Sequence, residues 1–349
     1  MATKTRTPKA AAKDNSSPVA PTMCVISDAT RRRRDGRMTE TNGGSSVERV
    51  PGFNALRPMT AGFDTTRVSG PTILASVADG GFFSIAPQTL VAAAPSLPNY
   101  GGTGKPEDVI GVDDRVIIPD SSLTPWRCIC HLEITYDSGQ VGFGTGWFAG
   151  ERTVITAGHC LYARPTAIQP ARRARQVRVI PGRNGNLAPY GYVVADKFDW
   201  HPKWESEKEE KDAAPYDYGV IFVDHEVNGA PFGERIGYFG LRSYEKDEEK
   251  LLDMAIVNNA GYPHEAAKPY GSLWFNAGRV HMQDAAHKDD RFLEYMVDTT
   301  GGDSGSPVFL FDSTANQRYV VAVHTTGNFI NRGVRITAEV YDQILAWAK

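Results

Sequence analysis

Short apolar runs separated by glycine and proline turns fill the chain from about residue 107 to its end. The runs are rich in β-branched and aromatic residues and follow one another at fairly regular spacing, which is typical of strands. Many short strands of this kind indicate an all-β barrel or sandwich. Only the last segment, 338–349, spaces its apolar residues as a helix does. The predicted strands are 128–136, 141–149, 153–156, 177–180, 219–223, 254–258, 295–298, 307–311 and 319–324.

The first hundred residues have a different pattern. Ser, Pro, Gly and Arg interrupt them throughout, and only short apolar pieces such as 72–77 and 81–85 stand out. This pattern predicts a loosely ordered leader with a few docking segments. The turn-forming sequence NYGGTGKP at 99–106 is typical of a linker. We therefore expect two regions, a leader over 1–107 and a β domain over 108–349.

Composition and charge narrow the class of protein. The 349 residues are 41% hydrophobic and 23% charged, as in ordinary soluble globular proteins. A formal net charge of −3 gives no reason to expect nucleic acid as a partner. The basic block 31–34 could bind an anionic partner, but a solvated stretch of the leader is the favoured interpretation. The sequence contains no run of about 18 apolar residues, so no membrane span is predicted. The N-terminus lacks the apolar stretch of a signal peptide, so conventional secretion is not supported.

Three segments carry residues that make chemical sense together. His159 ends the apolar strand of VITAGHC, Asp217 precedes the strand of YDYGVI, and Ser304 lies in the glycine-rich turn TTGGDSGSPV. A serine hydroxyl is a poor nucleophile near neutral pH, so it needs a base, and the base needs an acceptor on its other nitrogen. Each residue alone also fits a plain structural role, as a turn, a satisfied histidine or a strand-end cap. The combination on an all-β pattern favours a catalytic triad.

The same turn supplies a site for an oxyanion. The N–H groups of Gly302 and Ser304 can together bind a developing negative charge. This chemistry needs no cofactor, and we expect no metal ligands. A catalytically idle, peptide-binding or scaffold protein of the same fold is the alternative from another class.

The segments around these three residues resemble a known protein family. TAGHC, YDYG and GGDSGSPVF resemble the trypsin-like double-barrel serine peptidases. VIGVDDR, PGRNG, GYFG, GYP, AVHTTG and NRGVRIT are similar to the bacterial glutamyl endopeptidase branch, and the likeness runs from about Asp108 to Lys349. The resemblance implies two packed six-stranded antiparallel β-barrels with the triad in the cleft between them. It also implies a serine endopeptidase whose substrate is a peptide or protein.

The resemblance further implies which residues bind the substrate. His324 and Thr299 line the primary specificity pocket in the family pattern, and Thr325, Thr326 and Val109 complete the expected set. An imidazole and hydroxyls can donate to a carboxylate, so we expect Glu, or Asp, at the cleavage position. Some family members bring a basic side chain towards the pocket from the loop before the triad aspartate. In this chain that loop, 201–217, is rich in glutamate, so Lys203 or Lys208 would have to supply the positive charge.

The cysteines depart from the family pattern. Family members commonly carry a cysteine just before the TGW segment to pair with the one after the histidine, but this chain has Gly144 there. Cys160 therefore lacks its expected partner. Either Cys128 or Cys130 replaces it, or all three are free buried thiols.

The leader raises the question of activation. In the family the mature chain begins close to the VIG segment, and its new amine helps to form the acid-binding pocket. A Glu-specific enzyme could cut the Glu107–Asp108 bond itself, although Glu107 is equally well explained as a linker residue. The resemblance implies export, whereas the missing signal peptide fits an intracellular or non-classically exported protein. In an intracellular, partner-controlled protease the leader would dock on the peptidase domain or on another protein.

Overall fold

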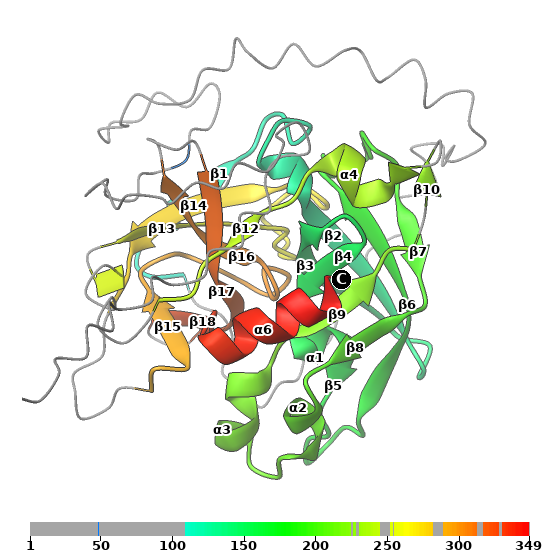
Figure 1. Cartoon of the computed structure of the whole chain (residues 1–349), viewed down its shortest axis with the longest axis vertical. Coiled ribbons are helices and arrows are strands. Elements are labelled where there is room, and N and C mark those ends of the chain that lie inside the picture. Colours follow the sequence, from blue (N-terminus) through cyan, green and yellow to red (C-terminus); the bar gives the residue numbers. More distant parts are fainter. Residues whose placement is uncertain are drawn as a thin grey trace, which may run out of the picture.

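A computed structural model of the chain contains two β-sheets, each curled into a barrel-like body, and a C-terminal helix that spans both (Figure 1). The predominantly β architecture confirms the predicted fold class. The structure describes residues 48, 109–224, 226–227, 230–244, 252–253, 255–281, 289–312, 317–327 and 330–348.

The first sheet has the strand order β5-β6-β2-β3-β4-β9-β8, with β7 paired to β6. All of its pairings are antiparallel, and its apolar side chains form one core inside the barrel. The strands are β2 (Ile129–Tyr136), β3 (Val141–Gly150), β4 (Thr153–Thr156), β5 (Tyr162–Ala163), β6 (Arg172–Pro181), β7 (Val193–Ala195), β8 (Phe198–Trp200) and β9 (Gly219–Phe222).

The second sheet has the order β1-β14-β13-β16-β17-β18-β15, and β12 pairs in parallel with β17. A separate apolar core fills this second barrel. The strands are β1 (Val116–Ile117), β12 (Gly240–Leu241), β13 (Ile256–Gly261), β14 (Trp274–Arg279), β15 (Phe292–Tyr295), β16 (Pro307–Asp312), β17 (Gln317–Thr326) and β18 (Asn331–Arg335).

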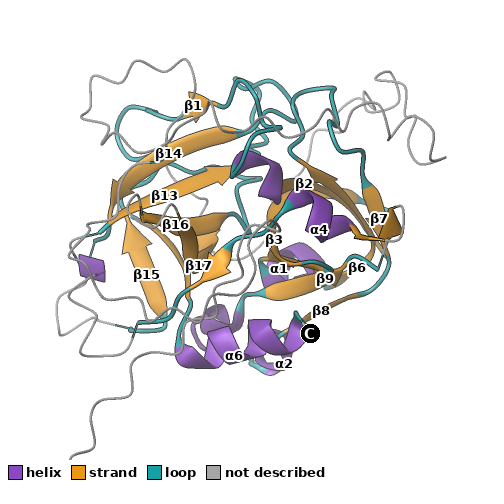
Figure 2. Cartoon of the chain, turned by 45° about the horizontal axis from the view of Figure 1, so that its top comes forward, coloured by secondary structure: helices purple, strands orange, loops and turns teal. Residues whose placement is uncertain are grey.

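Short helices and one small ladder lie around the two barrels (Figure 2). The longest of the helices, α6, begins after Thr337, whose hydroxyl accepts a hydrogen bond from the Val340 N–H and so caps the first turn. The elements are α1 (Gly158–Leu161), α2 (Pro202–Ser206), α3 (Glu210–Ala213), α4 (Phe232–Ile236), α6 (Ala338–Trp347), the 3-10 turns η4 (Trp126–Cys128) and η5 (Ala214–Tyr216), and the ladder β10 (Glu226–Val227) with β11 (Ala230–Pro231).

Two predicted strands match the observed ones closely: 153–156 is identical to β4, and 307–311 differs from β16 only by Asp312. Within the described residues each sheet has eight strands rather than six, because short rim strands such as β1, β5 and β12 extend the sheets. The strand predicted at 295–298 lies earlier, at Phe292–Tyr295. Beyond Tyr295, the Val297 carbonyl accepts from the Asn331 side chain, and the Asp298 carboxylate accepts the N–H groups of Ile110 and Asp114.

The two ends of the β domain tie the barrels together. Strand β1 pairs with β14 of the second barrel, although the next long strand, β2, belongs to the first. Helix α6 follows the second barrel and reaches back to the first, where Trp347 packs edge-on against Tyr218 and its carbonyl accepts from Thr153. A third apolar cluster, which includes Trp147 and Phe309, fills the space between the barrels. Their relative position is therefore set by packing as well as by the chain ends.

Within the leader the structure describes only Glu48. Its side chain is fully buried, and both carboxylate oxygens accept hydrogen bonds from Arg318 at 2.8 Å. Its backbone N–H donates to the Asn258 side chain at 2.7 Å. The predicted docking segments 72–77 and 81–85, the basic block 31–34 and Cys24 lie outside the described residues. None of the helices that the structure describes has the length and apolar character needed to cross a membrane.

Candidate active site

His159 and Asp217 meet on the first barrel. His159 lies in α1, directly after β4, and Asp217 lies just before β9, which pairs with β4. One carboxylate oxygen of Asp217 contacts His159 Nδ1 at 2.8 Å, and the other accepts the His159 backbone N–H at 2.7 Å. The two bonds hold both the ring and the main chain of the histidine. The structure thus brings together two of the three residues that the sequence singled out.

The electrostatics of this pair suit a general base. Burial is the largest influence on His159 and lowers its pKa, but the Asp217 charge and hydrogen bond, together with Cys160, outweigh burial and raise the pKa well above 6.5. The Asp217 side chain is almost completely buried, so its charge is poorly screened by water. Asp217 therefore stabilises the protonated imidazole that a general base forms.

Ser304 lies in a tight turn that only glycine neighbours permit. Gly302 has φ +104° and Gly305 has φ +86°, both in the region that side chains disfavour. A Cβ on Gly305 would come within 2.2 Å of the Thr156 hydroxyl, and one on Gly302 within 2.5 Å of the Tyr262 carbonyl. The turn therefore packs directly on both barrels.

Thr145, a fully buried residue of β3, joins the Ser304 turn to the first barrel. Its backbone N–H donates to the Ser304 carbonyl at 2.9 Å, and its hydroxyl donates to the Gly302 carbonyl at 2.8 Å. The same hydroxyl accepts the Tyr262 N–H at 2.9 Å. The Cys160 thiol, next to His159 in the chain, lies 3.8 Å from the Ser304 carbonyl. These contacts hold the Ser304 turn against β3 and α1, and α1 carries His159. Sequence reasoning missed the role of Thr145.

The predicted oxyanion group is also in this turn. The Gly301 carbonyl accepts the His264 N–H at 2.6 Å, and the Gly302 carbonyl is held by Thr145. Among the described residues, the Gly302 N–H donates to no protein group. This donor is available for a ligand oxygen.

The predicted pocket residues converge on the second barrel. His324 is buried near the end of β17, and its Nδ1 lies 2.6 Å from the Tyr295 hydroxyl. Thr299 is completely buried, and its hydroxyl has no hydrogen-bond partner among the residues that the structure describes. Thr325 is buried beside His324, and the hydroxyl of Thr326 accepts from Arg332 at 3.3 Å. Sequence reasoning identified neither Tyr295 nor Arg332.

The segment that starts at Val109 also reaches this region. The Ile110 N–H and the Asp114 N–H donate to the two oxygens of Asp298, at 2.7 and 3.0 Å. Asp298 directly precedes Thr299 in the chain. Burial raises the Asp298 pKa above its ordinary value, although the two N–H donors act in the opposite direction. Ile110, the residue after Val109, therefore bonds Asp298, the residue before Thr299, and this bond brings Val109 close to the expected pocket.

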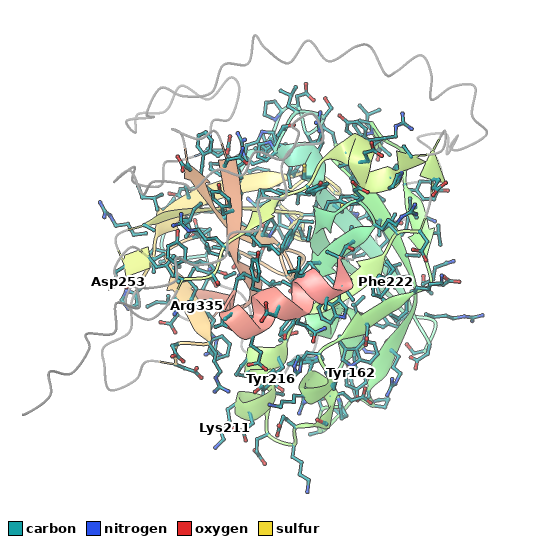
Figure 3. All side chains as sticks on the ribbon, viewed as in Figure 1. Tyr162, Lys211, Tyr216, Phe222, Asp253 and Arg335 are labelled. Carbon is teal, nitrogen blue, oxygen red and sulfur yellow. The ribbon has the colours of Figure 1, made fainter. Side chains whose placement is uncertain are left out.

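Lys203 and Lys208, which we expected to bring positive charge to the pocket, have other surroundings. Lys203 donates to the Tyr216 hydroxyl at 3.0 Å and lies over the Tyr216 ring, and Lys208 is exposed. Tyr216 belongs to η5, which packs against β18 (Figure 3). Arg164 holds the acidic loop by donating to the carbonyls of Trp204 and Glu207. The described contacts thus engage Lys203 with an aromatic ring and leave it no contact with His324 or Thr299.

The three described cysteines, Cys128, Cys130 and Cys160, are free and buried. The alternative of free thiols is therefore the one found. A Cβ at Gly144 would lie 2.9 Å from the Cys160 sulfur and 3.8 Å from its Cβ. Gly144 occupies the position that a partner cysteine would need, and the Cys160 thiol fills the space between β3 and α1.

The part of the chain that the structure describes contains no group of three or more His, Cys, Asp or Glu residues arranged to hold a metal ion. The donor set at the site is one imidazole, one carboxylate and one hydroxyl. A set of this kind matches nucleophilic catalysis by serine.

Comparison with known proteins identifies the family. The Trypsin family model matches residues 121–348. A glutamyl endopeptidase of Bacillus licheniformis is 35% identical over 248 residues, covering 69% of each chain, and a Bacillus subtilis protein named extracellular metalloprotease is 32% identical over 248 residues, covering 70% of this chain and 71% of its own. A solved Glu endopeptidase in complex with MPD has a TM-score of 0.55 at 25% identity and covers 69% of this chain and 99% of that chain.

A protease from Arthrobacter nicotinovorans shares the fold, with a TM-score of 0.50 at 20% identity, covering 69% of this chain and 100% of that chain. These matches agree with the two barrels and with the segments that resembled the family in sequence. The chain therefore belongs to the trypsin family and is a serine endopeptidase with the chymotrypsin fold.

Proposed function

We propose that the chain hydrolyses peptide bonds through the triad Ser304, His159 and Asp217. The observation that carries the proposal is the doubly bonded His159–Asp217 pair, at 2.7 and 2.8 Å, beside a turn that holds Ser304 against the same barrel. His159 accepts the Ser304 proton as the serine oxygen attacks the substrate carbonyl carbon. It then returns the proton to the leaving amine, and water releases the acyl group in a second, equivalent cycle.

The oxyanion formed in each cycle would be held by the N–H groups of Gly302 and Ser304. A donor of this kind contributes roughly 3 kcal/mol to transition-state stabilisation. Asp217 orients the imidazole and stabilises its charged form. No step needs a group from outside the chain other than water.

Labelling with a fluorophosphonate probe tests the triad. The wild-type chain should be labelled on Ser304, and Ser304→Ala should not be labelled at all. Ser306→Ala is the matched control, because this serine lies in the same turn and bonds Asn259 rather than the triad. Persistent labelling of Ser304→Ala would refute the assignment, whereas an unlabelled wild-type chain would favour a catalytically idle, peptide-binding protein.

A preference for Glu, or Asp, at the cleavage position is the finer part of the proposal. The buried Thr299 hydroxyl without a described partner and the His324 imidazole can both donate to a substrate carboxylate. If the Tyr295 hydroxyl donates to His324 Nδ1, the proton of the imidazole stays on Nε2, from which it can be donated. The name of the Bacillus licheniformis relative, glutamyl endopeptidase, supports the same preference.

A panel of peptides that differ only at the cleavage position tests this preference. Cleavage should be fastest after Glu, and Thr299→Val should reduce the preference for Glu over Gln because the hydroxyl donor is lost. Thr135→Val, on β2 of the first barrel, is the control, because Thr135 is not among the expected pocket residues. Turnover mainly after Arg, Lys or large apolar residues would contradict the proposal.

The precursor model concerns residues 1–107. A cut at Glu107–Asp108 would free an amine next to Val109, which lies beside the segment bound to Asp298. Glu48 supports docking of the leader on the peptidase domain rather than on another protein, because its carboxylate is buried against Arg318. N-terminal sequencing of the active enzyme tests the cut. Finding Met1 on fully active enzyme would count against it.

A further inference from the structure

Arg115 makes an unusually complete set of contacts beside the catalytic turn. Its side chain is 2% exposed and lies against three carboxylates. All five of its N–H groups have acceptors: the two Asp113 oxygens at 2.9 Å each, Glu265 at 2.7 Å, Asp303 at 3.2 Å and the Thr300 hydroxyl at 2.8 Å. A guanidinium in this position fixes the relative places of the groups around it.

Two of those groups bracket the oxyanion segment. Thr300 and Asp303 flank Gly301 and Gly302, and Asp303 directly precedes Ser304. The loop between them is closed by two further bonds, from the Asp303 N–H to the Thr300 carbonyl and from the Thr300 N–H to the Asp303 carboxylate, each 3.0 Å long. Arg115 therefore clamps both ends of the loop that presents the Gly302 N–H.

Charge explains why the clamp needs a cation. The Asp303 side chain is 3% exposed, and a buried carboxylate is costly unless it is paired and hydrogen-bonded. Arg115 is the cation that pairs with it. Burial lowers the Arg115 pKa, but the surrounding carboxylates outweigh this effect, so the pKa stays above its ordinary value and the charge persists. Without this cation, Asp303 would gain by turning towards water and would draw the turn with it.

We propose that Arg115 is a positioning residue for the oxyanion turn, and that the turn is assembled before the leader is cut. Arg115 belongs to the same chain before and after cleavage at Glu107–Asp108, and it bonds Asp303 in the uncut chain. Removal of the leader would then change substrate binding at the pocket. The catalytic turn would already have its shape before the cut. The proposal rests on the triad mechanism above and goes beyond it in assigning the support of the turn.

Kinetics of Arg115→Gln test the first part. Loss of one oxyanion donor in comparable enzymes lowers kcat by about 10²–10³. We expect a fall in kcat of about 10² or more with KM within about threefold, because the substrate pocket keeps its own residues. Arg335→Gln is the control, since Arg335 is a buried arginine of β18 that donates to the main-chain carbonyls of Tyr244 and Asp290 (Figure 3).

A second variant guards against simple misfolding. Arg115→Met combined with Asp303→Asn removes the buried cation and the buried carboxylate together, so the chain should fold with a melting temperature close to wild type. Its kcat should stay low, and its affinity for a peptide aldehyde, which forms an oxyanion, should fall more than its affinity for the matching peptide amide. Wild-type kcat in this double variant, or equal losses of affinity for the two ligands, would overturn the role of Arg115.

The second part is tested with Glu107→Gln, kept uncut as verified by mass spectrometry. A small fluorophosphonate should label Ser304 in this uncut chain at a rate within about fivefold of the processed enzyme. Absence of labelling until the leader is removed would overturn early assembly of the turn. If the processed wild-type enzyme itself is not labelled, the triad mechanism fails instead, so the two failures are distinguishable.

Discussion

The two halves of the candidate catalytic site are held in different ways. On the first barrel, His159 and Asp217 bond each other directly and come from neighbouring paired strands. On the second barrel, the Ser304 turn depends on distant segments: Thr145 of the first barrel and Arg115 of the N-terminal segment. The first half is a local pair, whereas the second is a junction of three parts of the chain. Substitutions in the His159–Asp217 pair should therefore affect proton transfer alone. Substitutions around the Ser304 turn should affect the position of the serine and of the oxyanion donors.

The largest effect is expected in the local pair. Asp217→Asn keeps the shape of the residue but removes the charge and favours the wrong histidine tautomer, so kcat should fall by about 10⁴ as in comparable triads. The melting temperature should change little because asparagine has nearly the same size and can still form hydrogen bonds with His159. Steady-state kinetics and thermal unfolding measure the two effects, with Asp199→Asn on β8 as control. A fall below tenfold would mean that Asp217 does not orient the base.

The pH profile sharpens the same half. His159 must be neutral to accept the serine proton, and Asp217 raises its pKa well above 6.5. We expect kcat/KM to fall as the pH drops through that pKa and to level off above it. Residual activity of Asp217→Asn should show the acidic limb at lower pH, since the charge that favours imidazolium is gone. An acidic limb at the same pH in both enzymes would assign it to another group.

A cross-link between β3 and α1 tests the packing of the first barrel around His159. In Gly144→Cys, the new Cβ would lie 3.8 Å from the Cys160 Cβ, the mean separation in disulfides. We expect a bridge under oxidising conditions and a stability gain of about 3 kcal/mol for a loop of this length. Thermal unfolding with and without reductant measures the gain. The same substitution in a Cys160→Ala background should give none, and a gain there would exclude the bridge as its cause.

The junction is weakened by Thr145→Val, which keeps the volume but removes the hydroxyl between Gly302 and Tyr262. A displacement of the turn by about 1 Å would lower kcat by roughly 10². Each buried group left without a partner would also cost about 1–3 kcal/mol of stability. Thr145→Ser keeps the hydroxyl and should retain most of the activity. If valine and serine variants behave alike, the hydroxyl is not what holds the turn.

The smallest effect on catalysis is expected far from both halves. Arg318 and His324 are six residues apart on β17, about 20 Å in an extended strand. Glu48→Gln should therefore leave kcat within twofold of wild type while weakening the hold on the leader, because the bidentate pair with Arg318 is lost. Size-exclusion chromatography after cleavage at Glu107–Asp108 measures leader retention. A leader retained equally by both proteins would place its main attachment elsewhere.

Much of the site could be predicted from sequence. Long apolar runs such as 307–311 predicted strands because a buried strand needs little beyond apolar side chains. His159, Asp217 and Ser304 stood out because each lies in a short segment next to a predicted strand. Strand β14 could not be predicted in this way, since WFNAGR mixes polar and small residues: Asn276 bonds Asp114, and Gly278 packs against the Met296 carbonyl.

By itself, the sequence determined the fold class and the glycines of the turn around Ser304, because these depend on local patterns and on backbone conformations that few residues adopt. It also singled out the three residues of the proposed triad. Only the tertiary structure decided what supports them. Thr145, Arg115 and Tyr295 have no distinguishing local pattern, and their partners lie far away along the chain. Such bonds exist only after two barrels and an N-terminal segment have packed together, so they depend on the fold as a whole.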